Sequence, residues 1–101
     1  MKAIVLLLAV SVLLLSNGVG HANIAGEKLF NQKCAMCHVV KGKGGAIGPE
    51  LTKVGARMNE NQLRQKVMKP KSTNPSSTMP AFQTLPKVDL DAVVAYMKTL
   101  R

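Results

Sequence analysis

Residues 23–39 carry a helical pattern of apolar and small positions. They are Gly26, Phe30, Cys34 and Cys37, which follow one another by four, four and three residues, the repeat of one helix face. His38 stands four residues after Cys34 and shares that side. The pattern predicts a helix that presents both cysteines and the histidine on one side.

A second helix is predicted from Asn59 to about Met68. Asn59 belongs to the residue types favoured at an N-cap, and Gln62 stands three positions later, as in a capping box. Pro70 ends the helix, because proline lacks the backbone N–H that a helix interior requires.

A third helix is predicted from about Lys87 to Leu100. Acidic residues lie near its start and basic residues near its end, as the helix dipole prefers. Its apolar stripe consists of Leu90, Val93, Val94, Met97 and Leu100.

The segments between these helices are rich in turn-forming residues. Residues 41–50 hold four glycines and one proline, and residues 70–86 combine several prolines with several hydroxyl side chains. A loop as long as 70–86 in a small domain is usually functional or disordered. No segment alternates in the way a strand requires, so the expected fold class is all-α.

The N-terminal 22 residues have the order of a secretory signal peptide. Lys2 is followed by an apolar run from Ala3 to Leu15, and small residues precede a cleavage point after Ala22. The alternative is an uncleaved anchor, although this run of thirteen residues forms a helix of only roughly 20 Å, short of the roughly 30 Å hydrocarbon layer. We therefore expect a cleaved leader, residues 1–22, and a domain over residues 23–101 in the periplasm, without stable membrane insertion.

The chain is strongly basic. Loss of the leader removes one of the 14 basic side chains and none of the 5 acidic ones, so the formal net charge falls from +9 to +8. Such a charge favours an acidic partner, a membrane surface or nucleic acid, or simply keeps the protein soluble. Export, few aromatic side chains and the lack of a compact basic block argue against nucleic acid.

The pentapeptide CAMCH, residues 34–38, holds the two cysteines of the chain. A disulfide across so short a loop adds little stability and leaves His38 unexplained. A thioredoxin-like pair needs a βαβ pattern, and zinc needs a fourth ligand. Covalent attachment of one haem c explains every residue of the motif: Cys34 and Cys37 bond to the porphyrin, and His38 binds the iron.

A second iron ligand is expected among the methionines. Met36 lies inside the attachment loop, and Met97 belongs to an apolar helix stripe, where filling the core is its ordinary role. Met79 lies in the proline-rich loop, which is long enough to cross to the other face of the ring. Met58 and Met68 remain as alternatives. A thioether ligand raises the reduction potential and leaves no open position, which indicates electron transfer rather than catalysis.

Four segments in this order resemble the class I c-type cytochromes, across essentially the whole domain. They are GEKLFNQKCAMCH, IGPEL, TMPAF and VVAYMK. The resemblance implies a cytochrome c fold of three to four helices wrapped around one covalently bound haem. Unlike some members of the family, this chain has no tryptophan to contact a haem propionate.

The resemblance also implies residue roles. His38 and Met79 would be the iron ligands, and the carbonyl of Pro49 would accept a hydrogen bond from the His38 ring. Phe82 would shield the ring on the Met79 side. Gly26 and Phe30 would pack against Val93 and Tyr96 where the terminal helices cross.

The expected function is that of a monomeric, soluble one-electron carrier between redox proteins of an exported respiratory or photosynthetic chain, and not that of an enzyme. Exposed lysines would steer acidic redox partners to the haem edge: Lys41, Lys43, Lys69 and Lys71. The alternative is a membrane-anchored haem subunit of a multisubunit oxidase or reductase. A haem sensor or peroxidase-like enzyme would require Met79 to be absent or labile as a ligand.

Overall fold

The computed structural model describes the backbone of residues 18–101 and the side chains of residues 24–101. Over this range the chain forms α2 (Gly18–Lys33), α3 (Val54–Arg57), α4 (Glu60–Met68), the 3₁₀ helix η1 (Pro70–Ser72) and α5 (Lys87–Thr99). Apart from an isolated bridge between Val40 and Lys43, residues 18–101 contain no extended pairing. The all-α prediction is confirmed. Residues 1–17 of the predicted leader lie outside the described residues.

The two terminal helices, α2 and α5, cross at a glycine. A Cβ placed on Gly26 would meet the carbonyl oxygen of Ala92 and lie 2.9 Å from the Cβ of Tyr96. Only glycine therefore allows the two backbones to approach this closely. One turn further along α2, the rings of Phe30 and Tyr96 pack with centroids 5.4 Å apart, tilted by 57°.

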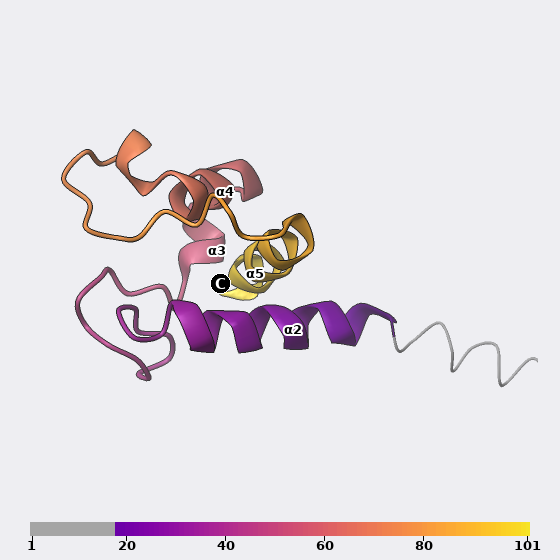
Figure 1. Cartoon of the computed structure of the whole chain (residues 1–101). Helices are drawn as coiled ribbons and strands as arrows, with labels where there is room; N and C mark the ends of the chain where they lie inside the picture. The colour runs from indigo at the N-terminus through magenta and orange to yellow at the C-terminus, as the bar shows by residue number, and fades with distance from the viewer. Residues whose placement is uncertain (1–17) are drawn as a thin grey trace, which may run out of the picture.

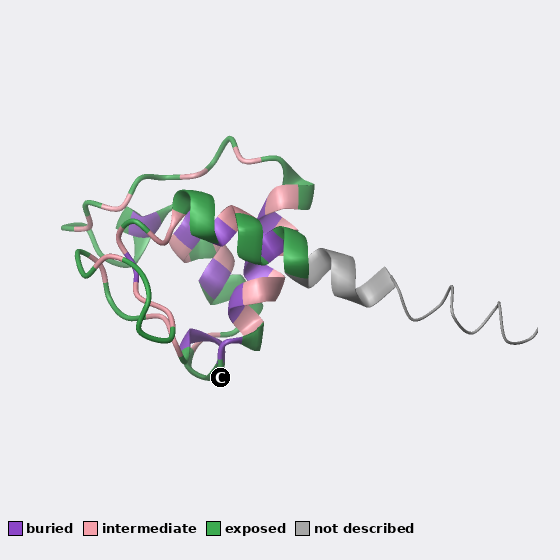
Figure 2. Ribbon diagram, turned by 90° about the horizontal axis from the view of Figure 1, so that it is seen from below, coloured by how far each residue is buried: buried purple, intermediate pink, exposed green. Residues whose placement is uncertain are grey.

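Helix α5 is the central element, because it contacts α2, α3 and α4 (Figure 1). Its predicted apolar stripe is buried, and the purple faces of the helices in Figure 2 turn toward one another. The core consists of Phe30, Val54, Leu63, Val67, Leu90, Val93, Val94, Met97 and Leu100.

Helix α4 begins and ends where the sequence predicts. The side chain of Asn59 accepts a hydrogen bond from the Gln62 backbone, and the Gln62 side chain accepts one from the Asn59 backbone, both at 2.9 Å. This capping box satisfies two backbone donors that the first turn leaves unpaired. Across the interface with α5, Arg64 pairs with Asp91 at 2.6 Å.

Helix α3 has no counterpart among the predicted helices. Its four residues carry too little periodicity to be recognised, and distant groups hold it in place. The Nζ of Lys98 donates to the carbonyls of Gly55 at 2.9 Å and Met58 at 3.2 Å, and the Gly55 N–H donates to Leu100 at 2.7 Å. The end of α5 therefore caps α3.

The first helix is shorter at its C-terminal end than predicted. The pattern predicts a helix to Val39, but α2 ends at Lys33. The carbonyl of Phe30 accepts hydrogen bonds from both Cys34 at 2.8 Å and Ala35 at 3.0 Å, so the regular repeat is lost there. At its other end α2 begins at Gly18, five residues before the expected start of the domain.

Within residues 18–101, no helix has the length and apolar character needed to cross a membrane.

Candidate functional site

Residues 34–37 form a tight turn at the end of α2, which we call the attachment turn. The Cys37 N–H donates to Cys34 at 3.1 Å, and the His38 N–H donates to the same carbonyl at 3.0 Å. Both cysteines are free thiols and half-buried, so the disulfide alternative is not formed. Burial raises the pKa of the Cys34 thiol from 9.0 to about 11. The turn thus keeps both sulfurs within one helical turn of the histidine.

The His38 side chain is buried and oriented. Its exposed fraction is 9%, and its Nδ1 lies 2.7 Å from the carbonyl oxygen of Pro49. A carbonyl can only accept, so Nδ1 carries a proton, and a lone pair for metal binding can then only be on Nε2. The Pro49 contact thus makes Nε2, on the side of the ring away from Pro49, the nitrogen that can bind a metal.

Glycine lets the following loop close over the imidazole. A Cβ on Gly48 would lie 2.5 Å from Cε1 and 2.8 Å from Nδ1 of His38. The Gly48 N–H also donates to the carbonyl of Cys37 at 2.7 Å. Gly48 is therefore a site residue that the sequence analysis did not single out, although it stands directly before Pro49 in the IGPEL segment.

A small apolar cavity brings Cys34 and Phe82 together, although they are far apart in the sequence. It is lined by Leu29, Lys33, Cys34, Val67, Phe82, Leu85 and Val93. The Phe82 N–H donates to the carbonyl of Val67 at 3.0 Å, and this bond joins the loop between η1 and α5 to α4. Phe82 thus lies within the reach of the attachment turn.

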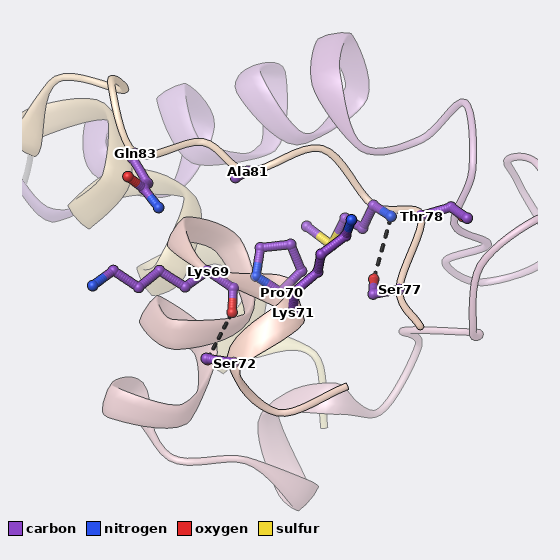
Figure 3. A pocket seen from close by; sticks show the side chains of 9 residues that line it. Lys69, Pro70, Lys71, Ser72, Ser77, Thr78, Ala81 and Gln83 are labelled. Carbon is purple, nitrogen blue, oxygen red and sulfur yellow. Dashed lines mark hydrogen bonds between the residues drawn. The ribbon is translucent and has the colours of Figure 1, made fainter. Parts of the chain in front are cut away.

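Met79 lies in a second, larger cavity of about 610 Å³. The lining residues are Lys69, Pro70, Lys71, Ser72, Ser77, Thr78, Met79, Ala81 and Gln83. Figure 3 shows it from close by, with Pro70 on one wall and Ala81 on the other. Met79 is half-buried, and its N–H donates to the Ser77 hydroxyl at 3.2 Å. This local contact fixes the backbone that carries the thioether.

The predicted iron ligands have separate surroundings. His38 is held by Pro49 and Gly48, whereas Met79 belongs to the cavity of residues 69–83. In Figure 1 the loop after α2 and much of the loop after η1 lie near the C-terminal end of α2.

The other methionines among the described residues have different environments. Met97 is buried in the core, and Met58 and Met68 pack against its edge. Met36 is 79% exposed on the attachment turn.

The residues present fit a covalently bound haem. Two free thiols stand beside an imidazole whose Nδ1 bonds to Pro49, which leaves Nε2 as the nitrogen that could bind iron. The nearby cavity that contains Cys34 is lined mainly by apolar side chains. A structural zinc site would need a cluster of protein ligands. No group of three or more His, Cys, Asp or Glu side chains that could hold a metal occurs in the described part of the chain.

Comparison with known proteins finds a relative that this chain matches over only part of the relative's length. The chain is 31% identical over 85 residues to a cytochrome c oxidase subunit 2 of Alkalihalophilus pseudofirmus. This match covers 75% of the chain but only 25% of the relative. The chain therefore spans about a quarter of the length of that protein.

The family comparison covers most of the chain. The sequence pattern of the cytochrome c family matches residues 24–101, which include the CxxCH attachment motif of Cys34, Cys37 and His38. The cofactor is accordingly one covalently bound haem c, and the helical architecture agrees with the family fold. This chain belongs to the cytochrome c family.

Proposed function

We propose that this cytochrome c domain is an exported, soluble one-electron carrier, with His38 and Met79 as its iron ligands. The observation that carries the proposal is the buried imidazole of His38, which Pro49 orients through Nδ1 so that Nε2 is the nitrogen left to bind iron. An imidazole that is already oriented loses little conformational freedom on binding metal.

When bound, haem c supplies reversible one-electron transfer at its iron. Cys34 and Cys37 anchor the group, and the Pro49 carbonyl raises the basicity of His38. Phe82 and the apolar side chains beside it exclude water from the ring. A second ligand from the protein leaves no open position for a substrate, so the domain transfers electrons without making bonds.

The environment of Met79 supports its role as the second ligand. It lies in a loop beside a cavity, whereas Met58, Met68 and Met97 pack in or against the core. Its neighbour Pro80 and the turn at Ser77 restrict the loop around it.

Export to the periplasm is supported by the position of the family match. The match begins at residue 24, directly after the predicted leader of residues 1–22. The domain would then act as a monomer between acidic redox proteins of a respiratory or photosynthetic chain. Electrostatic steering by exposed lysines requires the rate of electron transfer with such a partner to fall as salt rises, because salt screens exposed charges. A rate independent of ionic strength would exclude steering.

The direct test is production of the full chain with the haem-attachment machinery present. We expect a secreted protein whose mass includes one haem, whose spectrum is that of low-spin His/Met iron, and which titrates reversibly with one electron. A colourless, correctly exported product would refute the proposal. Carbon monoxide binding to the reduced protein at neutral pH would point instead to an open iron position, as in a sensor or peroxidase.

The second candidate is a membrane-anchored haem subunit of a multisubunit oxidase or reductase. The similarity to a cytochrome c oxidase subunit 2 favours it. The two candidates differ in the mature N-terminus: mass spectrometry that finds a start at Asn23 supports the soluble carrier. A retained leader, with the haem protein in the membrane fraction, supports the subunit.

A further inference from the structure

We propose that Thr52 is a positioning residue for the haem ligand His38. Its hydroxyl holds the segment that carries the Pro49 carbonyl, and through that carbonyl it sets how strongly His38 donates electrons to iron. The inference rests on the proposed role of His38 as an iron ligand and deepens it, because it names a side chain outside the CxxCH motif that tunes the reduction potential.

The Pro49 carbonyl is positioned by the residues on either side of it. Proline has no N–H, so Pro49 itself cannot donate a backbone hydrogen bond. The N–H groups of Gly48 before it and Leu51 after it donate to carbonyls of the chain around His38, at 2.7 and 2.9 Å. Glu50, which shares a peptide bond with Pro49, lies between these two contacts and is held by its other groups.

The orientation of the Pro49 carbonyl follows the position of Glu50. The peptide bond between the two residues is planar, so the carbonyl oxygen can turn only together with the Glu50 nitrogen. Two side chains hold Glu50: the Thr52 hydroxyl donates to its Oε1 at 2.7 Å, and Nη2 of Arg57 donates to its carbonyl at 3.2 Å. Holding Glu50 therefore holds the oxygen that accepts a hydrogen bond from His38.

Thr52 also binds a fixed point of the chain on its other side. Its hydroxyl accepts a hydrogen bond from the Lys41 N–H at 2.9 Å, since a hydroxyl can donate and accept at once. Two backbone hydrogen bonds between Val40 and Lys43, of 2.9 and 3.1 Å, close the turn that contains Lys41. Thr52 thus links this turn to Glu50. The link is well defined, because a β-branched side chain is stiff at χ1.

The Thr52 hydroxyl acts on the iron without carrying a charge. A strong hydrogen bond from Nδ1 of His38 to the Pro49 carbonyl raises the basicity of Nε2. A more basic ligand stabilises the oxidised iron, which has the higher charge, so loss of the Thr52 contacts should raise the reduction potential. Because Thr52→Val changes neither the net charge nor the branched shape, a shift in that variant would come from positioning.

The test measures both the hydrogen bond and the potential in the secreted holoprotein. Thr52→Val should shift the equilibrium with a one-electron mediator about threefold toward reduced haem, or about 28 mV at about 59 mV per tenfold change. In NMR spectra of the reduced protein, the His38 Nδ1 proton should exchange with deuterium about threefold faster or more, because the bond opens more often. Thr52→Ser keeps the hydroxyl and should restore both values.

Variants of Glu50 test the same link from its other end. Glu50→Gln removes the carboxylate charge but keeps a side-chain oxygen that can accept from Thr52, so the exchange rate of the Nδ1 proton should stay near that of the unmodified protein. Glu50→Ala removes this acceptor and should accelerate the exchange as Thr52→Val does.

Thr99→Val is the matched control. The Thr99 hydroxyl is exposed and donates to the carbonyl of Tyr96 at 2.6 Å, so this variant removes a comparable contact that lies within α5. It should leave both the potential and the exchange rate unchanged. Equal shifts in Thr99→Val and Thr52→Val would show a general effect of lost hydroxyl contacts and would overturn the inference.

The inference and the carrier function fail in different ways. An unmodified protein without a low-spin His/Met spectrum would count against the carrier itself. If that spectrum is present, an unchanged potential in Thr52→Val overturns the role of Thr52. A changed potential with an unchanged exchange rate of the His38 Nδ1 proton also overturns it, because the effect would then bypass the Pro49 hydrogen bond.

Discussion

The two regions that carry the proposed iron ligands are built differently. On the His38 side, backbone hydrogen bonds join the loop to the attachment turn and its flanks across the sequence: Gly45 to Ala35, Gly48 to Cys37, and Leu51 to Val39. On the Met79 side, the bonds between Asn74, Ser77 and Met79 are local. The first long-range bond after Met79 is that of Phe82 to Val67.

The contrast indicates that the chain itself fixes the His38 side, whereas the Met79 side would be fixed mainly by the bound haem. Packed glycines and a 2.7 Å hydrogen bond define the position of the imidazole. The thioether side relies on short-range turns, which open more easily than bonds that span elements. We therefore expect substitutions beside His38 to affect folding and substitutions beside Met79 to affect mainly the redox properties.

The largest effect should come from His38→Ala. It removes the buried ring together with the Pro49 hydrogen bond, and it deprives the iron of its first ligand. We expect a loss of more than about 4 kcal/mol in the free energy of unfolding, the range of lost metal ligation and broken buried networks. Urea unfolding of the secreted protein measures it. Near-normal stability would show that the His38 side does not organise the fold.

Met79→Ala should leave a folded haem protein with changed electronic properties. The sulfur-to-iron absorption band should disappear, and the reduction potential should fall by on the order of 0.1 V, within the roughly 0.8 V range that axial ligands span. Met68→Ala is the control and should keep the band. A band that survives in Met79→Ala would move the ligand assignment to Met58 or Met68.

Gly48→Ala tests the packing against the imidazole. The added Cβ would meet the His38 ring, so we expect about 1–3 kcal/mol of destabilisation from overpacking. Displacement of the His38 ring from the Pro49 carbonyl weakens the imidazole as an electron donor to iron, so the reduction potential should rise by tens of millivolts. About 59 mV corresponds to a tenfold change in a one-electron equilibrium.

Gly42→Ala is the matched control for this variant. Gly42 has open space around its Cα but a φ of 78°, so alanine there is strained without approaching His38. It should cost about 1–2 kcal/mol and leave the potential unchanged. Equal potentials in the two variants would contradict the close fit at Gly48.

The smallest effect should come from Asp91→Asn, at the contact of α4 with α5 that supports the Met79 side. Hydrogen bonds from Lys87 and Arg64 hold the pKa of the Asp91 carboxyl below its ordinary value of 3.8. A lowered pKa stabilises the folded state above pH 4, and that contribution is lost as pH falls through the folded pKa. Thermal unfolding between pH 3 and pH 7 should show a slightly flatter acid limb in Asp91→Asn. Identical acid limbs in the variant and the unmodified protein would show that the ion pair contributes nothing measurable to stability.

Local signals account for most of the fold that could be predicted. The capping box of Asn59 and Gln62 and the stripe of α5 depend on residues a few positions apart, and both are confirmed in the structure. The end of α2 could not be predicted, because the apolar repeat continues through His38 while the Phe30 carbonyl accepts two donors. Helix α3 depends on Lys98, more than forty residues later, which no local pattern encodes.

Some parts of the candidate site could be predicted from the sequence, and others could not. The attachment motif is read directly from CAMCH, and the Pro49 contact implied by the family resemblance is present. The close fit of Gly48 on His38 depends on how segments ten residues apart fold together. Met79 and Phe82 remain predictions as haem contacts.

The glycine crossing of α2 and α5 has a consequence for biogenesis. Gly26 packs closely on Ala92 and Tyr96, so the core closes only after nearly the whole sequence has been synthesised. The CAMCH thiols stand at the front of that sequence and emerge long before α5 does. We therefore expect the attachment motif to be accessible until the final helix packs against α2.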